Sequence, residues 1–203
     1  MKTVITIGRQ YGSGGHEIGL RLARKLNVPF YDKELLQKAA KESGLCEKIF
    51  HQFDEKPRSV LYSIAMDSYP FILPGAGMGE SLDQQVYLAT YNTIRRMADR
   101  GPCVIIGRCA DYALADQSNL LTLFISAPLA MRIQTVEQRE GLSAEKAKAL
   151  ISRTDKRRAA YYEYYSSRKW GGVDSYDFCL NSAVFGLDGS VELIQQVIEM
   201  KEA

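Results

Sequence analysis

The sequence predicts an α/β protein of three layers, in which helices cover both faces of a central parallel sheet. Residues 3–8 (TVITIG) form a short β-branched apolar run ending in glycine, which is typical of a strand buried on both faces. Similar runs follow along the chain, separated by stretches of helical length, and parallel strands need crossovers of that size. The 203 residues are one typical domain in length.

Most expected elements have clear limits. Further strands are expected at 103–106, 120–125 and 176–180, with a short extended piece at 28–31. Helices are expected at 14–26, 33–43, 82–100, 142–168 and 190–201. Gly44 and the Gly101-Pro102 pair end two of these helices, and Pro128 suits the first turn of another. Residues 46–80 carry no clear pattern.

Composition excludes several classes of protein. The formal charge is only +2, from 26 Lys+Arg against 24 Asp+Glu, which argues against a dedicated nucleic-acid binder. The four cysteines form no C-x-x-C pair and there are two histidines, so no metal site is expected from them. Cys103 and Cys179 lie in apolar runs and are expected to be buried thiols. With no signal peptide and no apolar run of membrane length, we expect a soluble cytoplasmic protein.

The first motif with chemical meaning is RQYGSGG, between the first strand and the first helix. Its glycines let backbone N–H groups curl round an anion, and the helix adds its free N–H groups and the positive end of its dipole. We therefore expect Gly12, Ser13, Gly14 and Gly15 to bind phosphate. The alternative is a tight glycine turn that binds no ligand.

The motif departs from the usual G-x-x-x-x-G-K-[ST] pattern at two positions. Arg9 stands where the first glycine belongs, and Gly15 stands where the lysine belongs. A lysine–phosphate contact contributes about 1.5–3 kcal/mol, so its loss needs a replacement. Our hypothesis is that Arg9 supplies the missing positive charge.

His16 and Glu17 open the helix that follows the loop. Glu17 favours the positive end of the helix, and a carboxylate there could also reach Mg²⁺ directly or through water. His16 is either a polar residue of the first turn or a catalytic group.

Six segments together resemble the cytidylate kinase-like proteins, relatives of the nucleoside monophosphate kinases with the P-loop NTPase fold. They are 5–26 (ITIGRQYGSGGHEIGLRLARKL), 29–36 (PFYDKELL), 101–112 (GPCVIIGRCADY), 153–162 (RTDKRRAAYY), Lys169-Trp170 and 176–182 (YDFCLNS). The resemblance implies a parallel sheet of about five strands, a possible acceptor-side insertion at 46–80 and a helical lid at 142–172. It also implies ATP and Mg²⁺ as cofactors.

Three residues near strand ends are candidates for binding the acceptor. Arg108 follows the third strand and resembles the arginine that contacts the acceptor in cytidylate kinases; its planar fork suits a phosphate. Asp111 is a second candidate at the same edge. Asp32 either binds an acceptor base or sugar, or caps the helix expected at 33–43.

A basic cluster lies on the long helix near the end of the chain. Arg153 and Arg157 are four residues apart and share a face, and Arg158 follows, so these arginines resemble a lid that closes over the transferring group. Asp155 lies three residues before Arg158, so the two are candidates for a local ion pair. A solvated helix face of mixed charge is the alternative to a lid. The tyrosines that follow are compatible with a lid contact or a homodimer contact.

These features favour a kinase that moves the γ-phosphoryl of ATP to a small acceptor such as CMP or another nucleoside monophosphate. Two alternatives stay open at this point: a nucleotide-binding sensor module without turnover, and a kinase for a non-nucleotide acceptor. The expected partners are a nucleoside triphosphate and a small acceptor, with neither membrane nor nucleic acid.

Overall fold

The computed structural model describes residues 2–32 and 82–203. Within them, five parallel strands form one sheet in the order β2-β3-β1-β4-β5. The strands are β1 Val4–Arg9, β2 Phe30–Tyr31, β3 Val104–Ile106, β4 Leu120–Ser126 and β5 Phe178–Asn181. Because β1 is the central strand, the chain that leaves its carboxyl end lies in the middle of the sheet edge where ligands collect in α/β proteins.

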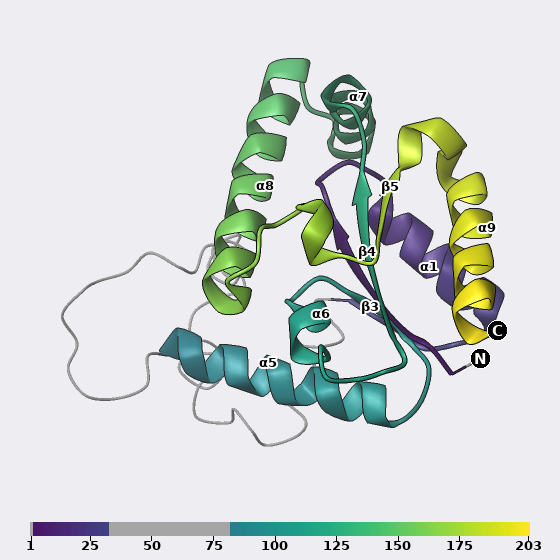
Figure 1. Ribbon diagram of the computed structural model, residues 1–203. Coiled ribbons are helices and arrows are strands. Elements are labelled where there is room, and N and C mark those ends of the chain that lie inside the picture. Colours follow the sequence, from purple (N-terminus) through teal and green to yellow (C-terminus); the bar gives the residue numbers. More distant parts are fainter. Residues whose placement is uncertain (1, 33–81) are drawn as a thin grey trace.

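Helices cover both faces of this sheet (Figure 1). On one face lie α1 (Gly15–Leu26) and α9 (Ser182–Glu202), and on the other lie α5 (Leu82–Asp99) and α6 (Ala110–Ala113). Two further helices, α7 (Leu129–Glu140) and α8 (Ala144–Ser166), pack on each other beyond the carboxyl ends of the strands. A short 3₁₀ turn, Val173–Ser175, leads into β5.

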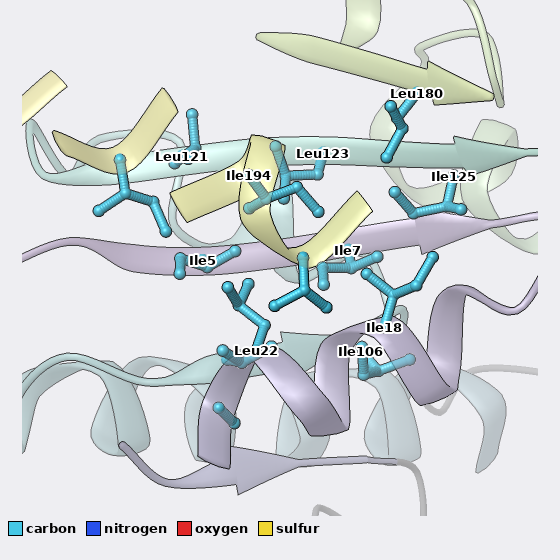
Figure 2. Close-up of a cluster of buried hydrophobic side chains, with 14 residues drawn as sticks. Ile5, Ile7, Ile18, Leu22, Ile106, Leu121, Leu123, Ile125, Leu180 and Ile194 are labelled. Atoms are coloured by element: carbon cyan, nitrogen blue, oxygen red, sulfur yellow. The ribbon is translucent and has the colours of Figure 1, made fainter. Parts of the chain in front are cut away.

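Packing in the hydrophobic core fixes the position of α1 against the central strand, β1. Figure 2 shows Ile7 of β1 and Leu123 of β4 facing Ile18 of α1 and Ile194 of α9, and all four side chains are fully buried. Gly19 lets α1 approach closely, because an added Cβ there would lie 2.6 Å from Ile106 Cδ1. The loop between β1 and α1 is therefore held at both ends by packed elements.

The fold class expected from the sequence is confirmed, including the five parallel strands. The last helix starts earlier than expected, at Ser182, because a kink at Gly186 (φ 66°) interrupts its pattern. α6 was not expected, and the full length of α7 was not predicted from Pro128. The helix expected at 33–43, with the N-cap role of Asp32, and the segment 46–80 lie outside the described residues.

Two smaller findings concern side-chain chemistry. Cys103 is buried as expected, but the expectation for Cys179 was wrong: it is exposed, because β5 is an edge strand. In the described part of the chain, no helix has the length and apolar character needed to cross a bilayer.

Candidate active site

The loop at the end of β1 has the backbone of an anion-binding turn. Gly12 and Gly14 have φ angles of 81° and 77°, values that side chains other than glycine rarely tolerate. Gly14 is the N-cap of α1 and, as a glycine, supplies no side-chain cap. The amide of Gly15 donates a long 3.4 Å hydrogen bond to Ser13 Oγ, and the next amides of the first turn are the kind of N–H groups that bind anions at helix N-termini. A Cβ at Gly12 would lie 2.8 Å from the carbonyl oxygen of Arg132, so α7 packs directly on the loop.

Ser13 holds the loop together from inside. Its hydroxyl donates to the carbonyl oxygen of Gln10 at 2.9 Å, and its own carbonyl accepts a 2.7 Å hydrogen bond from the hydroxyl of Ser182 at the start of α9. Ser13 is buried. It thus contributes to the site through its backbone, while its side chain fixes the turn.

The helix α8 rests on this loop through one carboxylate and one guanidinium. Asp155 Oδ1 accepts a 2.7 Å hydrogen bond from the amide of Tyr11, and Asp155 Oδ2 pairs with Arg132 Nη1 at 2.6 Å. Arg158 Nη1 donates to the carbonyl oxygen of Arg9 at 3.0 Å, and its guanidinium lies 5.4 Å from the centre of the Tyr11 ring. The predicted lid helix and the predicted phosphate loop are therefore in contact.

The other two arginines of the cluster lie on the same helix. Arg157 is partly buried, whereas Arg153 is exposed, one turn nearer the start of α8. The structure thus brings Arg158 into contact with the loop, while Arg157 is partly buried and Arg153 is exposed on the same helix.

An unusual turn follows β3 at the same edge of the sheet. Gly107, Arg108 and Cys109 have φ angles of 68°, 61° and 53°, so three successive residues are left-handed. Arginine and cysteine have no intrinsic preference for this region, and such strain gathers at functional sites. The turn places the Arg108 guanidinium 5.8 Å from the centre of the Tyr161 ring on α8. Burial raises the pKa of the Cys109 thiol, so Cys109 is a packing residue rather than a nucleophile.

At the start of α1, the candidate polar side chains make local pairs. His16 Nε2 lies 3.5 Å from Asp32 Oδ2, so the structure brings these two predicted residues together. Glu17 Oε1 accepts a 2.7 Å hydrogen bond from Arg21 Nε, one turn further along the helix. Glu17 therefore lies beside the loop with one oxygen engaged by a neighbouring cation.

Comparison with known proteins decides the family. The sequence model of the cytidylate kinase-like family matches residues 4–184, which is most of the chain. The chain belongs to this family. Curated relatives include the cytidylate kinases of Thermococcus sibiricus (30% identical over 60% of this chain and 67% of that protein) and Methanocaldococcus jannaschii (22% identical over 97% of each). The match to the cytidylate kinase of Desulfurococcus amylolyticus, at 28% identity, spans 62% of that protein.

Solved structures support the fold. An uncharacterized protein from Eubacterium ventriosum superposes with a TM-score of 0.75 at 28% identity, over 98% of this chain and 99% of that one. The shikimate kinase of Bacteroides thetaiotaomicron gives 0.55 at 16% identity over 98% and 99% of the two chains, a likeness of fold alone. The protein is thus a member of the cytidylate kinase-like family, a family of nucleotide-dependent kinases, with the α/β fold of P-loop kinases.

Sequence reasoning missed two residues whose contacts hold the loop of the candidate site against α7 and α8. Arg132 lies at the start of α7 and is buried against the loop, but Pro128 was the only local sign of that helix. Asp155 was noted only as a potential partner of Arg158, whereas its carboxylate binds Arg132 and the loop amide. Both contacts join segments far apart in the chain, so no local pattern reveals them.

Asp111 is placed differently from the other acceptor candidates. It is buried in α6, and its Oδ2 accepts a 2.6 Å hydrogen bond from the hydroxyl of Tyr162 on α8. Burial raises the pKa of this carboxyl, opposed by the Tyr162 hydrogen bond and by the charge of Arg168. Asp111 therefore joins α6 to α8, and a direct acceptor contact stays a prediction.

The raised pKa of Asp111 predicts a pH-dependent stability. The folded state holds the Asp111 proton more tightly than the unfolded state, so this contribution is full below the ordinary pKa of about 4 and is lost as the pH rises through the raised value. The variant Asp111→Asn keeps an oxygen that can accept the hydrogen bond from Tyr162. Its amide does not titrate, so it does not lose stability as the pH rises. We expect the unfolding temperature of Asp111→Asn, relative to the parent, to rise with pH in thermal melts. A pH-independent difference would contradict this.

Proposed function

We propose that the protein transfers the γ-phosphoryl of ATP, with Mg²⁺, to a small acceptor such as CMP or another nucleoside monophosphate. The contact between the glycine loop and the arginine-bearing helix carries this proposal, because Arg158 of α8 donates to the backbone of Arg9 at the end of β1. Phosphoryl transfer depends mainly on positioning and on cations around the transferring group. A loop that binds phosphate, next to a helix rich in arginine, meets both needs.

Each predicted residue has a role in this proposal. The backbone of Gly12–Gly15 binds the donor phosphates, and Arg9 adds positive charge. Arg108 binds the acceptor, with Asp32 and Asp111 as further acceptor contacts, and His16 remains at the first turn of α1. Arg157 and Arg158, with Arg153, stabilise the negative charge that spreads over the γ-phosphoryl oxygens.

In the proposed reaction, an acceptor oxygen forms the new bond to the γ-phosphorus as the bond to the β-phosphate oxygen breaks, and ADP leaves.

The residues near the loop fit a magnesium ion held mostly by phosphate and water. Mg²⁺ in kinase sites takes one or two carboxylates and keeps several waters. Glu17, in the first turn of α1, would supply such a carboxylate beside the loop. When bound, the ion would neutralise charge on the donor phosphates, while the arginines orient the transferring group.

The test is an assay of phosphoryl transfer from ATP with Mg²⁺ to a panel of nucleoside monophosphates. We expect turnover of CMP or a related acceptor, and at least a tenfold lower kcat in the Arg157→Ala/Arg158→Ala variant, because two cations are lost near the transferring group. The matched control is Lys146→Ala/Lys148→Ala, which removes the same charge from exposed positions of α8. Equal losses in both double variants would contradict the roles of Arg157 and Arg158.

The lysine-free loop supports one alternative, a module that binds a nucleotide without turnover. Binding of ATP with no transfer to any acceptor in the panel would favour this alternative or a non-nucleotide acceptor. The cytoplasmic location and the homodimer remain predictions from the sequence.

A further inference from the structure

We propose that Arg9 and Gly15 are a reciprocal exchange of the glycine and lysine that phosphate loops usually carry at these two positions. In the usual loop the positive charge is a lysine at the start of the helix and the first position is glycine. Here the positive charge is Arg9, at the end of β1, and the glycine is Gly15, at the start of α1. This inference rests on the proposed binding of a nucleotide by the loop, and it adds the physical reason why Arg9 and Gly15 occur together.

The space around Gly15 shows why the two changes belong together. A Cβ added at Gly15 would lie 2.7 Å from Arg9 Cβ, 3.2 Å from Arg9 Cγ and 3.1 Å from Ile125 Cβ. Arg9 Cβ is fixed to the backbone of β1 and cannot swing aside, whereas the 3.1 Å contact with Ile125 Cβ needs a shift of only a few tenths of an ångström. Positions 9 and 15 therefore have room for one side chain between them. The usual loop fills position 15 and this loop fills position 9.

The path of the Arg9 side chain shows where the charge lies. It passes Gly15, and its Nη1 lies so close to Gly107 that a Cβ there would overlap it. Gly107 directly follows β3, the neighbour of β1 in the sheet, and begins the left-handed turn that carries Arg108. The guanidinium is thus placed between the phosphate loop and the predicted acceptor side, where its fork can bind two phosphate oxygens at once.

Arg9 is also joined to the helix that carries the arginine cluster. Its carbonyl oxygen accepts the 3.0 Å hydrogen bond from Arg158 Nη1, and β1 and β4 are paired up to Arg9 and Ile125. The backbone that carries Arg9 is therefore fixed from two sides, which holds the side chain in one direction. A lysine on α1 would have no such link to α8.

Four proteins test the exchange: the parent, Arg9→Gly, Gly15→Lys and Arg9→Gly/Gly15→Lys. We expect Arg9→Gly to fold normally and to bind MgATP ten- to a hundredfold more weakly in titration calorimetry, because one charge-assisted contact is lost. Gly15→Lys should lower the unfolding temperature, because two side chains then compete for one space. The double variant should unfold at the same temperature as Arg9→Gly. It should bind MgATP at least tenfold more tightly than Arg9→Gly does.

Two outcomes would overturn the exchange: parental affinity in Arg9→Gly, or a double variant that binds MgATP no better than Arg9→Gly. Failure of the proposed function is separate. A parent that binds MgATP but transfers phosphate to no acceptor leaves the binding comparison intact, so the exchange is still decided. A parent that binds no MgATP overturns both.

Discussion

Replacement of Asp155 by alanine is expected to lower the midpoint of thermal unfolding by roughly 6–12 °C, which corresponds to about 3 kcal/mol in a chain of this size. The Asp155 and Arg132 side chains are only 17% and 10% exposed, and their oxygen and nitrogen lie 2.6 Å apart. Removal of the carboxylate leaves the Arg132 charge buried without its counter-ion. It also leaves the amide of Tyr11 without its 2.7 Å acceptor.

An exposed ion pair elsewhere in the chain is the matched control. Arg95 and Asp116 form two parallel hydrogen bonds of 2.8 and 2.9 Å, but the Asp116 side chain is 64% exposed. Water and salt screen such a pair, so Asp116→Ala should leave the unfolding temperature almost unchanged. Equal shifts in Asp155→Ala and Asp116→Ala, measured by calorimetry, would show that the contact between α8 and the loop contributes no special stability.

The Asp155 contact also connects stability with ligand binding. The Asp155 carboxylate accepts a hydrogen bond from the amide of Tyr11 in the loop. Its loss should therefore make the loop backbone, which we expect to bind phosphate, less well ordered. MgATP should then stabilise Asp155→Ala less than it stabilises the parent. Asp155→Asn separates the two effects, because an amide oxygen can still accept from Tyr11 while the charge that faces Arg132 is lost.

The fold could be predicted from local patterns because each main strand and helix has a recognisable pattern within its own contiguous residues. Val4, Ile5 and Ile7 are apolar and Thr6 is β-branched, and all four are buried in the central strand. Gly12 and Gly14 could be assigned to the loop because their left-handed backbone needs glycine. α6 could not, because it has only four residues and follows Arg108 and Cys109, whose side chains do not indicate a left-handed turn.

The candidate site was predictable residue by residue but not as an arrangement. The motif shows that Arg9 and Gly15 depart from the usual pattern, but only the structure shows that their side-chain spaces overlap. Likewise, the position of Asp155 in a basic cluster suggested a local partner, while its partner Arg132 lies 23 residues away on another helix. Contacts between elements depend on packing, and a single sequence does not display packing.

Replacement of Arg108 by glycine is expected to raise stability and abolish most activity. Arg108 has φ 61° between two other left-handed residues, and relief of that strain should add about 1 kcal/mol to the free energy of unfolding. The lost guanidinium is the proposed acceptor contact, so kcat/KM for the acceptor should fall roughly 10²- to 10³-fold. Denaturant titration and steady-state kinetics on the same preparation measure both effects.

Asn27 provides the control for strain alone. It is left-handed too, with φ 54°, but it ends α1 at the opposite end of that helix from the phosphate loop. Asn27→Gly should give a smaller gain in stability, since asparagine tolerates this region better than arginine, and kcat/KM should stay at the parental value. If Arg108→Gly destabilises the protein, the turn is not strained. If it keeps parental kcat/KM, Arg108 does not bind the acceptor, and the left-handed turn after β3 serves packing against Tyr161 instead.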